Sequence, residues 1–162
     1  MKHRIILASA SKRRSRILKE CGIPHKVAVS NVSEKMDHEK GARFNVLHNA
    51  RLKAEKVAAK YKKGFVIGVD TVVLLGKRLI GKPKTKKEAK SILSAFSGKT
   101  ILVYTGLFII DIEREKSREA VDISKVHVKK LSRKEINKFV KIENSVVYPH
   151  DQNLARQFRA VE

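Results

Sequence analysis

The sequence predicts an α/β fold, in which strands and helices alternate along one layered domain. Short apolar, β-branched runs recur along the chain, and the stretches between them carry apolar residues at helical spacing. No internal repeat, low-complexity tract or long Pro/Gly/Ser linker interrupts this order. The 162 residues suffice for one domain with its own hydrophobic core, so a single domain over residues 1–162 is expected.

The first half of the chain is expected to contain two strands and two helices. Arg4–Ala8 is a short buried strand, and the helix behind it ends near Gly22 and Pro24. Phe44–Tyr61 is an amphipathic helix, and the β-branched run Gly64–Leu75 predicts a central strand. The apolar positions expected on the helices are Ile17, Leu18 and Cys21 in the first, and Leu47, Ala50, Ala54, Val57, Ala58 and Tyr61 in the second.

In the second half, two helix starts carry a capping box. Thr85 with Glu88, and Ser132 with Glu135, have the spacing at which a hydroxyl and a carboxylate satisfy free N–H groups of a first turn. These helices are expected to end near Gly98 and Lys141. Strands are expected at Arg78–Ile80 as the return of a hairpin, at Ile101–Ile112 and at Val121–Leu131. The pattern weakens after residue 144.

Basic residues dominate the charge of the chain. Lys and Arg number 37 against 16 Asp and Glu, a net charge of +21. Such a surplus attracts polyanions, including nucleotides, nucleic acids and anionic membranes. A highly charged surface is, however, also common in thermophilic or salt-adapted proteins. The single cysteine, Cys21, argues against a disulfide scaffold, and no stretch is long and apolar enough for a secretion signal or a membrane span, so a cytoplasmic protein is expected.

The segment Ser9–Arg14 follows a buried strand and opens a helix. Its hydroxyls, the free backbone N–H groups of a helix start and its two arginines would suit a bound phosphate. The alternative is a serine that merely caps a basic surface helix.

Asp70 lies inside the apolar run of a predicted strand. A carboxylate there loses its hydration, which is costly unless a cation or metal compensates its charge. Aspartates at strand ends also hold metals at the rim of α/β sheets. The alternative is an aspartate that ends the strand and caps a turn.

Lys82, between Gly81 and Pro83, could deliver an ammonium group to a phosphate or could be an ordinary loop lysine. Ser97–Thr100 resembles the end of a P-loop, but that motif needs a glycine where Leu93 stands and the reverse order of strand and helix. The histidines and the cysteine lack zinc-ligand spacing.

Together, five ordered motifs resemble the Maf family of nucleoside triphosphate pyrophosphatases. The opening LASASKRRSRIL is similar to that family's first motif, with Lys12 in place of a proline, and Glu34 matches its acidic position after the second strand. The further matching segments are LHNARLKAEKVA, GVDTVV, IGKP, and SGKT with VYTGL. The resemblance covers roughly residues 4 to 140.

The resemblance implies a mixed β-sheet flanked by helices, with two lobes around a cleft as in the Maf and inosine-triphosphatase group. It implies metal-dependent hydrolysis, with Mg²⁺ or Mn²⁺, of a nucleoside triphosphate to the monophosphate and pyrophosphate. The resemblance also implies that such an enzyme removes non-standard nucleotides from the nucleotide pool. In-line water, a metal and cations for the pyrophosphate leaving group are what this chemistry requires.

The same resemblance implies roles for individual residues. Ser9, Arg13 and Arg14 would bind the triphosphate at the helix start. Glu34 and Asp70 would bind the metal or prepare the attacking water, and both roles remain open for Asp70. Lys53 and Lys82 would neutralise phosphate charge.

The chain departs from the family pattern in its C-terminal part. Residues 144–162 do not reproduce the family's closing segment, so a divergent or truncated end is expected. Without that segment, an apolar strip on Ile101–Ile112 or Val121–Leu131 would lie open and favour a homodimer, unless Val146, Val147, Leu154 and Phe158 cover it. An alternative function is that of a basic nucleic-acid-binding module with weakened catalysis, although its few aromatic residues do not interleave with the basic runs.

Overall fold

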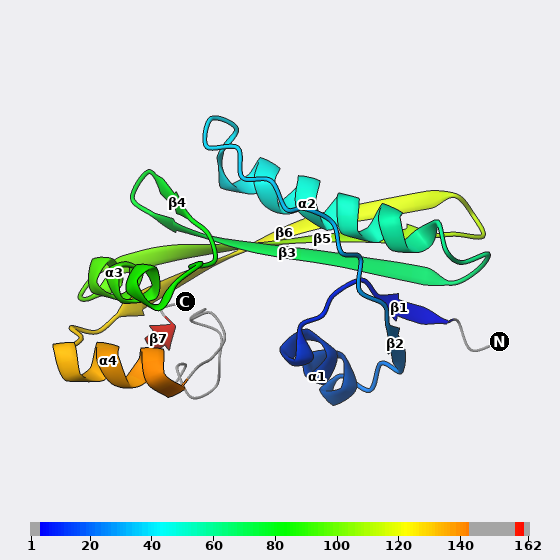
Figure 1. The fold of residues 1–162 in the computed structure, drawn as a ribbon. Coiled ribbons are helices and arrows are strands. Elements are labelled where there is room, and N and C mark those ends of the chain that lie inside the picture. Colours follow the sequence, from blue (N-terminus) through cyan, green and yellow to red (C-terminus); the bar gives the residue numbers. More distant parts are fainter. Residues whose placement is uncertain (1–3, 143–157, 161–162) are drawn as a thin grey trace. The chain divides into compact units, whose positions relative to one another are not determined.

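The computed structural model describes residues 4–142 and 158–160 of the chain (Figure 1). In chain order, its elements are β1 Ile5–Leu7, α1 Lys12–Glu20, β2 His25–Val27, α2 Gly41–Ala58, β3 Phe65–Leu75, β4 Arg78–Ile80, α3 Lys86–Phe96, β5 Thr100–Asp111, β6 Lys116–Val128, α4 Arg133–Ile142 and β7 Phe158–Ala160. Each helix and strand predicted above is present, with bounds shifted by a few residues. The short strands β2 and β7 have no clear periodicity of their own.

The strands form one mixed sheet. Their order is β2-β1-β3-β5-β6-β7, and β4 pairs with β3 off this path. Strand β1 is parallel to both β2 and β3, whereas β4 is antiparallel to β3 and β7 is antiparallel to β6. The predicted α/β class with a mixed, helix-flanked sheet is therefore confirmed.

The chain divides into two compact units, Met1–Thr71 with Tyr104–Asp122, and Val72–Val103 with Ile123–Glu162. Strands β3, β5 and β6 each contribute residues to both units. The cleft, and the single domain over residues 1–162, stay predictions.

In the first unit, α2 packs closely on the sheet and α1 lies on the side of β1 away from α2 (Figure 1). The buried face of α2 contributes Ala50, Ala54 and Val57 to a core that also includes Ile6 and Phe108. Two glycines allow the close approach of α2. A Cβ atom on Gly68 would overlap the backbone oxygen of Ala50, and one on Gly106 would lie 2.5 Å from the carbonyl carbon of Val46.

Replacing Gly68 with alanine should therefore push α2 away from β3. We expect a loss of about 1–3 kcal/mol of stability from overpacking, because the new Cβ atom would collide with the backbone of Ala50 and with the backbone and buried side chain of Ala54. Thermal melting measures the loss. A Gly68→Ala variant that melts like the wild type would show that α2 does not need this contact.

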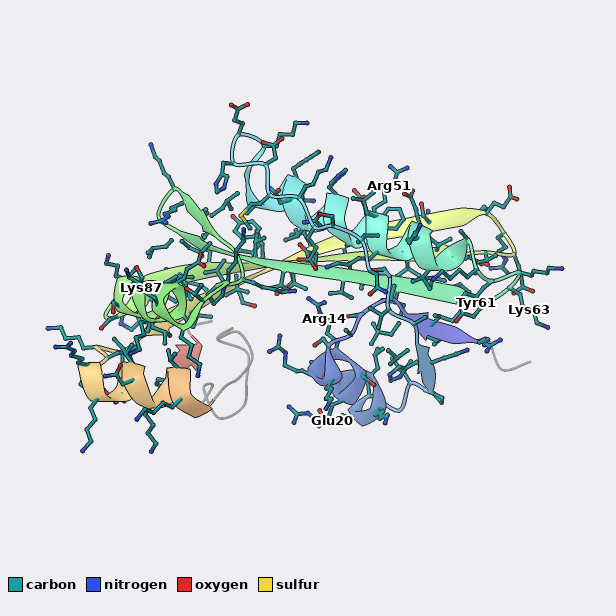
Figure 2. All side chains as sticks on the ribbon, in the orientation of Figure 1. Arg14, Glu20, Arg51, Tyr61, Lys63 and Lys87 are labelled. Atoms are coloured by element: carbon teal, nitrogen blue, oxygen red, sulfur yellow. The ribbon has the colours of Figure 1, made fainter. Side chains whose placement is uncertain are left out.

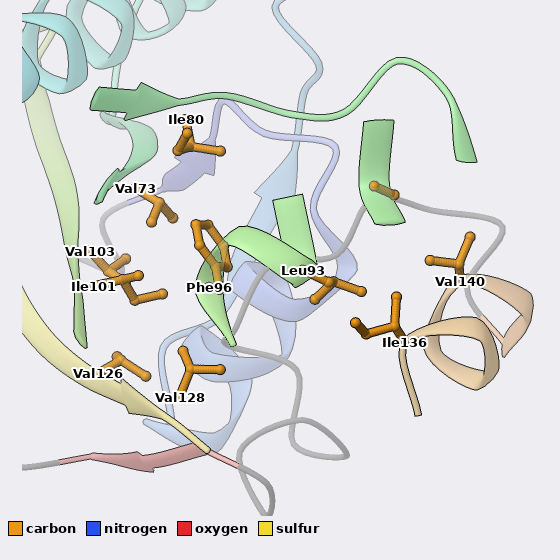
Figure 3. Packing of buried hydrophobic residues seen from close by; sticks show 11 residues of the cluster. Val73, Ile80, Leu93, Phe96, Ile101, Val103, Val126, Val128, Ile136 and Val140 are labelled. Atoms are coloured by element: carbon orange, nitrogen blue, oxygen red, sulfur yellow. The ribbon is translucent and has the colours of Figure 1, made fainter. Parts of the chain in front are cut away.

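In the second unit, α3 and α4 enclose a separate apolar core with residues of β3, β4, β5 and β6 (Figure 3). Phe96 and Leu93 of α3 lie at its centre, and Ile136 and Val140 of α4 pack against them. At both predicted capping boxes, the hydroxyl caps the helix start. The Thr85 hydroxyl accepts a hydrogen bond from the backbone N–H of Glu88, and the Ser132 hydroxyl accepts one from the backbone N–H of Glu135.

The second capping box predicts a pH-dependent contribution to stability. The Glu135 carboxylate accepts hydrogen bonds from Lys129 Nζ at 2.7 Å and from the backbone and hydroxyl of Ser132 at 2.8 Å. These bonds, that of Lys129 above all, lower the pKa of Glu135 from 4.5 to about 2. Because the pKa falls on folding, the ionised group stabilises the fold above about pH 4.5, and this contribution is lost as the pH falls toward 2.

We therefore expect Glu135→Gln to melt at a lower temperature than the wild type at pH 7, with a difference that closes between about pH 4.5 and pH 2. Melting curves across this range test it. Glu113→Gln, the same change at an exposed turn, is the control and should show no such trend. A difference that does not change with pH would contradict the assignment.

One expectation is wrong, one gains no support from the structure, and one concerns residues that the structure does not describe. Helix α1 buries none of its residues, and Ile17 and Cys21, predicted on an apolar face, are exposed, because α1 packs on the short strand β2. On β5 and β6, Ile123 is the only exposed large apolar side chain among the described residues, so no open strip supports the homodimer, which stays a prediction. Residues 144–157, expected to diverge or to cover such a strip, lie outside the described residues.

No described helix has the length and apolar character that crossing a membrane requires.

Candidate active site

The side chains of Asp70, Lys53 and Glu34 converge in the first unit. Lys53 Nζ lies 2.6 Å from Asp70 Oδ1 and 2.8 Å from Glu34 Oε1, and it also donates to the Val69 carbonyl at 3.3 Å. Asp70 and Lys53 are buried, whereas the Glu34 side chain is 38% exposed. The buried ammonium compensates the buried carboxylate, which would otherwise be costly to desolvate.

Asp70 lies within β3 rather than at its end, so the alternative of a strand-ending, turn-capping aspartate is wrong. Its neighbour strand β1 stops earlier, at Leu7, which pairs with Ile67. The site therefore lies just past the carboxyl end of β1, the edge at which α/β proteins bind ligands. Successive side chains of β3 point to opposite faces. Asp70 meets α2, and the next residue, Thr71, meets α1.

A stripe of polar residues on the buried face of α2 holds the loop that carries Glu34. Asn45 and Asn49 precede Lys53 at intervals of four residues, so all three share one side of the helix. The Asn49 amide pairs with both the backbone N–H and the carbonyl of Lys35, at 3.1 and 2.9 Å, and donates to Asp70 Oδ2 at 3.2 Å. Asn45 pairs in the same way with Asp37, at 2.7 and 2.6 Å. The stripe thus fixes the loop directly after Glu34.

Arg14 and Ser9 form a second group next to the first. The guanidinium of Arg14 donates to Ser9 Oγ, to the Val69 carbonyl and to Thr71 Oγ1, each at 3.1 Å. Figure 2 shows its side chain extending from α1 toward β3. The N-cap of α1 is Ser11, not Ser9, since its hydroxyl accepts from the Arg14 backbone at 3.4 Å. The Val69 carbonyl accepts from both Arg14 and Lys53, so the two groups are adjacent.

Two predicted residues remain, Arg13 and Lys82. Arg13 is half-buried at the start of α1, beside Arg14. Lys82 is exposed in the loop between β4 and α3 and belongs to the second unit. The phosphate-binding roles of Ser9, Arg13, Arg14 and Lys82 stay predictions.

The donor set fits a divalent cation. Two carboxylates share one ammonium group, which leaves a net negative charge among these three side chains. Mg²⁺ in nucleotide enzymes is held by one or two carboxylates together with substrate phosphates, and carboxylate oxygens suit Mn²⁺ equally. Within the described residues, no group of three His, Cys, Asp or Glu side chains forms a more complete metal cage. Binding of a divalent ion by Glu34 and Asp70 stays a prediction.

The profile of a protein family described as "Maf-like protein" matches residues 4–151. This chain belongs to the Maf family. The predicted family is confirmed.

Curated Maf relatives agree with the predicted class of enzyme. The dTTP/UTP pyrophosphatase of Dictyoglomus thermophilum is 38% identical over 141 residues, which cover 86% of this chain and 73% of the relative. The enzyme of the same name from Desulforamulus reducens is 38% identical over 136 residues, covering 84% and 71%. A hydrolase of nucleotide phosphoanhydrides, as predicted, is thus confirmed at the level of the Maf family.

A solved structure, a nucleoside-triphosphatase described as a dITP/XTP pyrophosphatase from Mycobacterium abscessus, is 13% identical with a TM-score of 0.48 over 79% of this chain and 75% of that one.

The resemblance assigned no role to Asn45, Asn49, Thr71 or Thr105, although the last three lie inside the matched segments LHNARLKAEKVA, GVDTVV and VYTGL. The hydroxyl of Thr105 lies 3.4 Å from that of Thr71 across β3 and β5. A signal for the asparagines does exist in the sequence, because polar residues at intervals of four interrupt the apolar face of a helix only when they have buried partners. The threonines carry no comparable signal, since their contact depends on strand register.

Proposed function

We propose that this protein hydrolyses a pyrimidine nucleoside triphosphate, dTTP or UTP, to the monophosphate and pyrophosphate in a metal-dependent reaction. The observation that carries the proposal is the convergence of Glu34 and Asp70 on the buried Lys53, next to the arginine-rich start of α1. The substrate class comes from the names of the relatives.

In the proposed reaction, the residues of the first unit bind and orient. Arg13 and the N–H groups at the start of α1 would bind the phosphates, while Arg14 holds this helix start against β3 through Val69 and Thr71. Lys53 and Asn49 each bind one oxygen of Asp70, which fixes the direction in which its carboxylate points. Asp70 and Glu34 would hold the divalent ion or take a proton from the attacking water. When bound, the ion supplies positive charge to the phosphate oxygens. Lys82 would neutralise the leaving pyrophosphate.

Release of pyrophosphate from a panel of triphosphates tests the proposal. With Mg²⁺ or Mn²⁺, we expect dTTP and UTP to react fastest among the standard nucleotides, and an excess of EDTA to abolish the reaction. The panel should include modified pyrimidine and purine triphosphates, because removal of non-standard nucleotides stays a prediction. Equal rates on purine and pyrimidine substrates would contradict the substrate class, and release of orthophosphate instead of pyrophosphate would contradict the reaction.

A further inference from the structure

The excess of positive charge is concentrated in the second unit. Its two segments, 72–103 and 123–162, contain 17 Lys and Arg against 5 Asp and Glu, an excess of 12 in 72 residues. The first unit contains 20 against 11, an excess of 9 in 90 residues. Even if every carboxylate of the second unit bound one cation of that unit, 12 cations would remain. Self-repulsion of this size destabilises a compact unit, so an anionic partner would relieve it.

Much of this charge lies on α3 and α4, whose lysines and arginines point outward (Figure 2). The two helices carry seven exposed cations and two carboxylates. Both carboxylates are engaged at helix starts, since Glu88 accepts from the backbone of Lys84 and Glu135 accepts from Ser132 and Lys129. The exposed surface of the helix pair is therefore strongly positive.

A groove of about 570 Å³ lies between α3 and α4. Lys90 and Arg133 line it with cations, Ser94, Ser97 and Asn137 line it with neutral polar groups, and Ile136 lies at its floor. Ser97 Oγ accepts a hydrogen bond from the backbone of Leu131, which leaves its hydroxyl proton to donate. Lys86 lies one turn before Lys90 on the same side of α3 and extends the basic lining. Lysine, arginine, serine and asparagine are the side chains that bind phosphate oxygens of nucleic acids.

We propose that the α3–α4 groove and its surrounding cations bind a nucleic-acid strand through its phosphate backbone. Cations spread over two whole helices suit a polymer of phosphates better than a single nucleotide. Phe96 is buried and Phe139 packs against the core, so neither ring offers bases a platform on which to stack. An anionic membrane is the weaker candidate, since Ile123 is the only exposed large apolar side chain described in this unit.

Binding of a fluorescent 20-nucleotide single-stranded RNA to the full chain, followed by anisotropy, tests the proposal. If four phosphates are contacted, the affinity should fall about 50-fold between 50 mM and 200 mM salt. Replacing Lys86, Lys90 and Arg133 together with glutamine should weaken binding at least tenfold at 100 mM salt and reduce the salt slope by about 2.

The matched control is the triple change of Lys56, Lys60 and Lys62 to glutamine, which removes the same charge from exposed positions of the first unit. It should weaken binding less than twofold, and melting curves verify that both variants fold. Equal losses in the two triple variants would overturn the proposal, because net charge alone would then explain binding. So would the absence of RNA binding at 50 mM salt, or tighter binding to phosphatidylglycerol vesicles than to RNA.

Discussion

Replacing Asp70 with asparagine is expected to lower kcat for pyrophosphate release by roughly 10²–10⁴-fold, the range typical of losing a positioned base or metal ligand. The amide is close in shape to the carboxylate but carries no charge, so it would bind a divalent ion more weakly and cannot accept a proton from water. Both oxygens of Asp70 already accept hydrogen bonds from Lys53 and Asn49, and the side chain is buried. The geometry therefore leaves little freedom for another group to take its place.

The measurement is pyrophosphate release with dTTP or UTP under saturating metal, with circular dichroism on the same samples. Asp111→Asn is the matched control, because it makes the same change to a carboxylate of the same unit outside the site, on β5. The control should keep its turnover. If Asp70→Asn turned over substrate at nearly the wild-type rate with an intact fold, neither the base nor the metal role of Asp70 could stand.

Replacing Lys53 with methionine is expected to cost about 3–5 kcal/mol of stability, because it leaves the buried Asp70 carboxylate without its cation. For a chain of this size, the loss corresponds to a fall in Tm of roughly 6–20 °C. Most of the effect comes from Asp70, since the Glu34 side chain is 38% exposed and water screens its pairing with Lys53. Turnover should fall as well, because Lys53 orients both carboxylates.

Two further variants separate the causes. Lys56→Met, an exposed position one turn from the site on the same helix, should change stability by no more than about 0.5 kcal/mol. The double variant Lys53→Met/Asp70→Asn removes both buried charges and should melt above Lys53→Met alone, while staying inactive. If Lys53→Met melted like the wild type, the ion pair would have no structural role. If the double variant melted below Lys53→Met, charge compensation would not be the reason for the loss.

The sequence by itself determined the order and type of the main elements. Its β-branched run at Gly64–Leu75, its helical spacing at Phe44–Tyr61 and its two capping boxes each predict a local structure that the chain adopts. These features depend on neighbours within a few residues, which is why a sequence pattern reveals them. The motifs also identified Glu34, Lys53 and Asp70 as candidates and the Maf family as their context.

Only the tertiary structure decided which of these residues meet. Lys53 and Asp70 are 17 positions apart, and their contact requires that α2 approach β3 across the bare backbone of Gly68. Arg14 is 57 positions from Thr71, and it reaches β3 because β1 stops at Leu7 and leaves that edge open. The apolar face expected on α1 is not buried, because that helix contacts the short strand β2 and reaches β3 through the polar side chain of Arg14. Spacing along a chain reports the face of an element, whereas the partner of that face depends on strand order and register, which arise only when the whole sheet has formed.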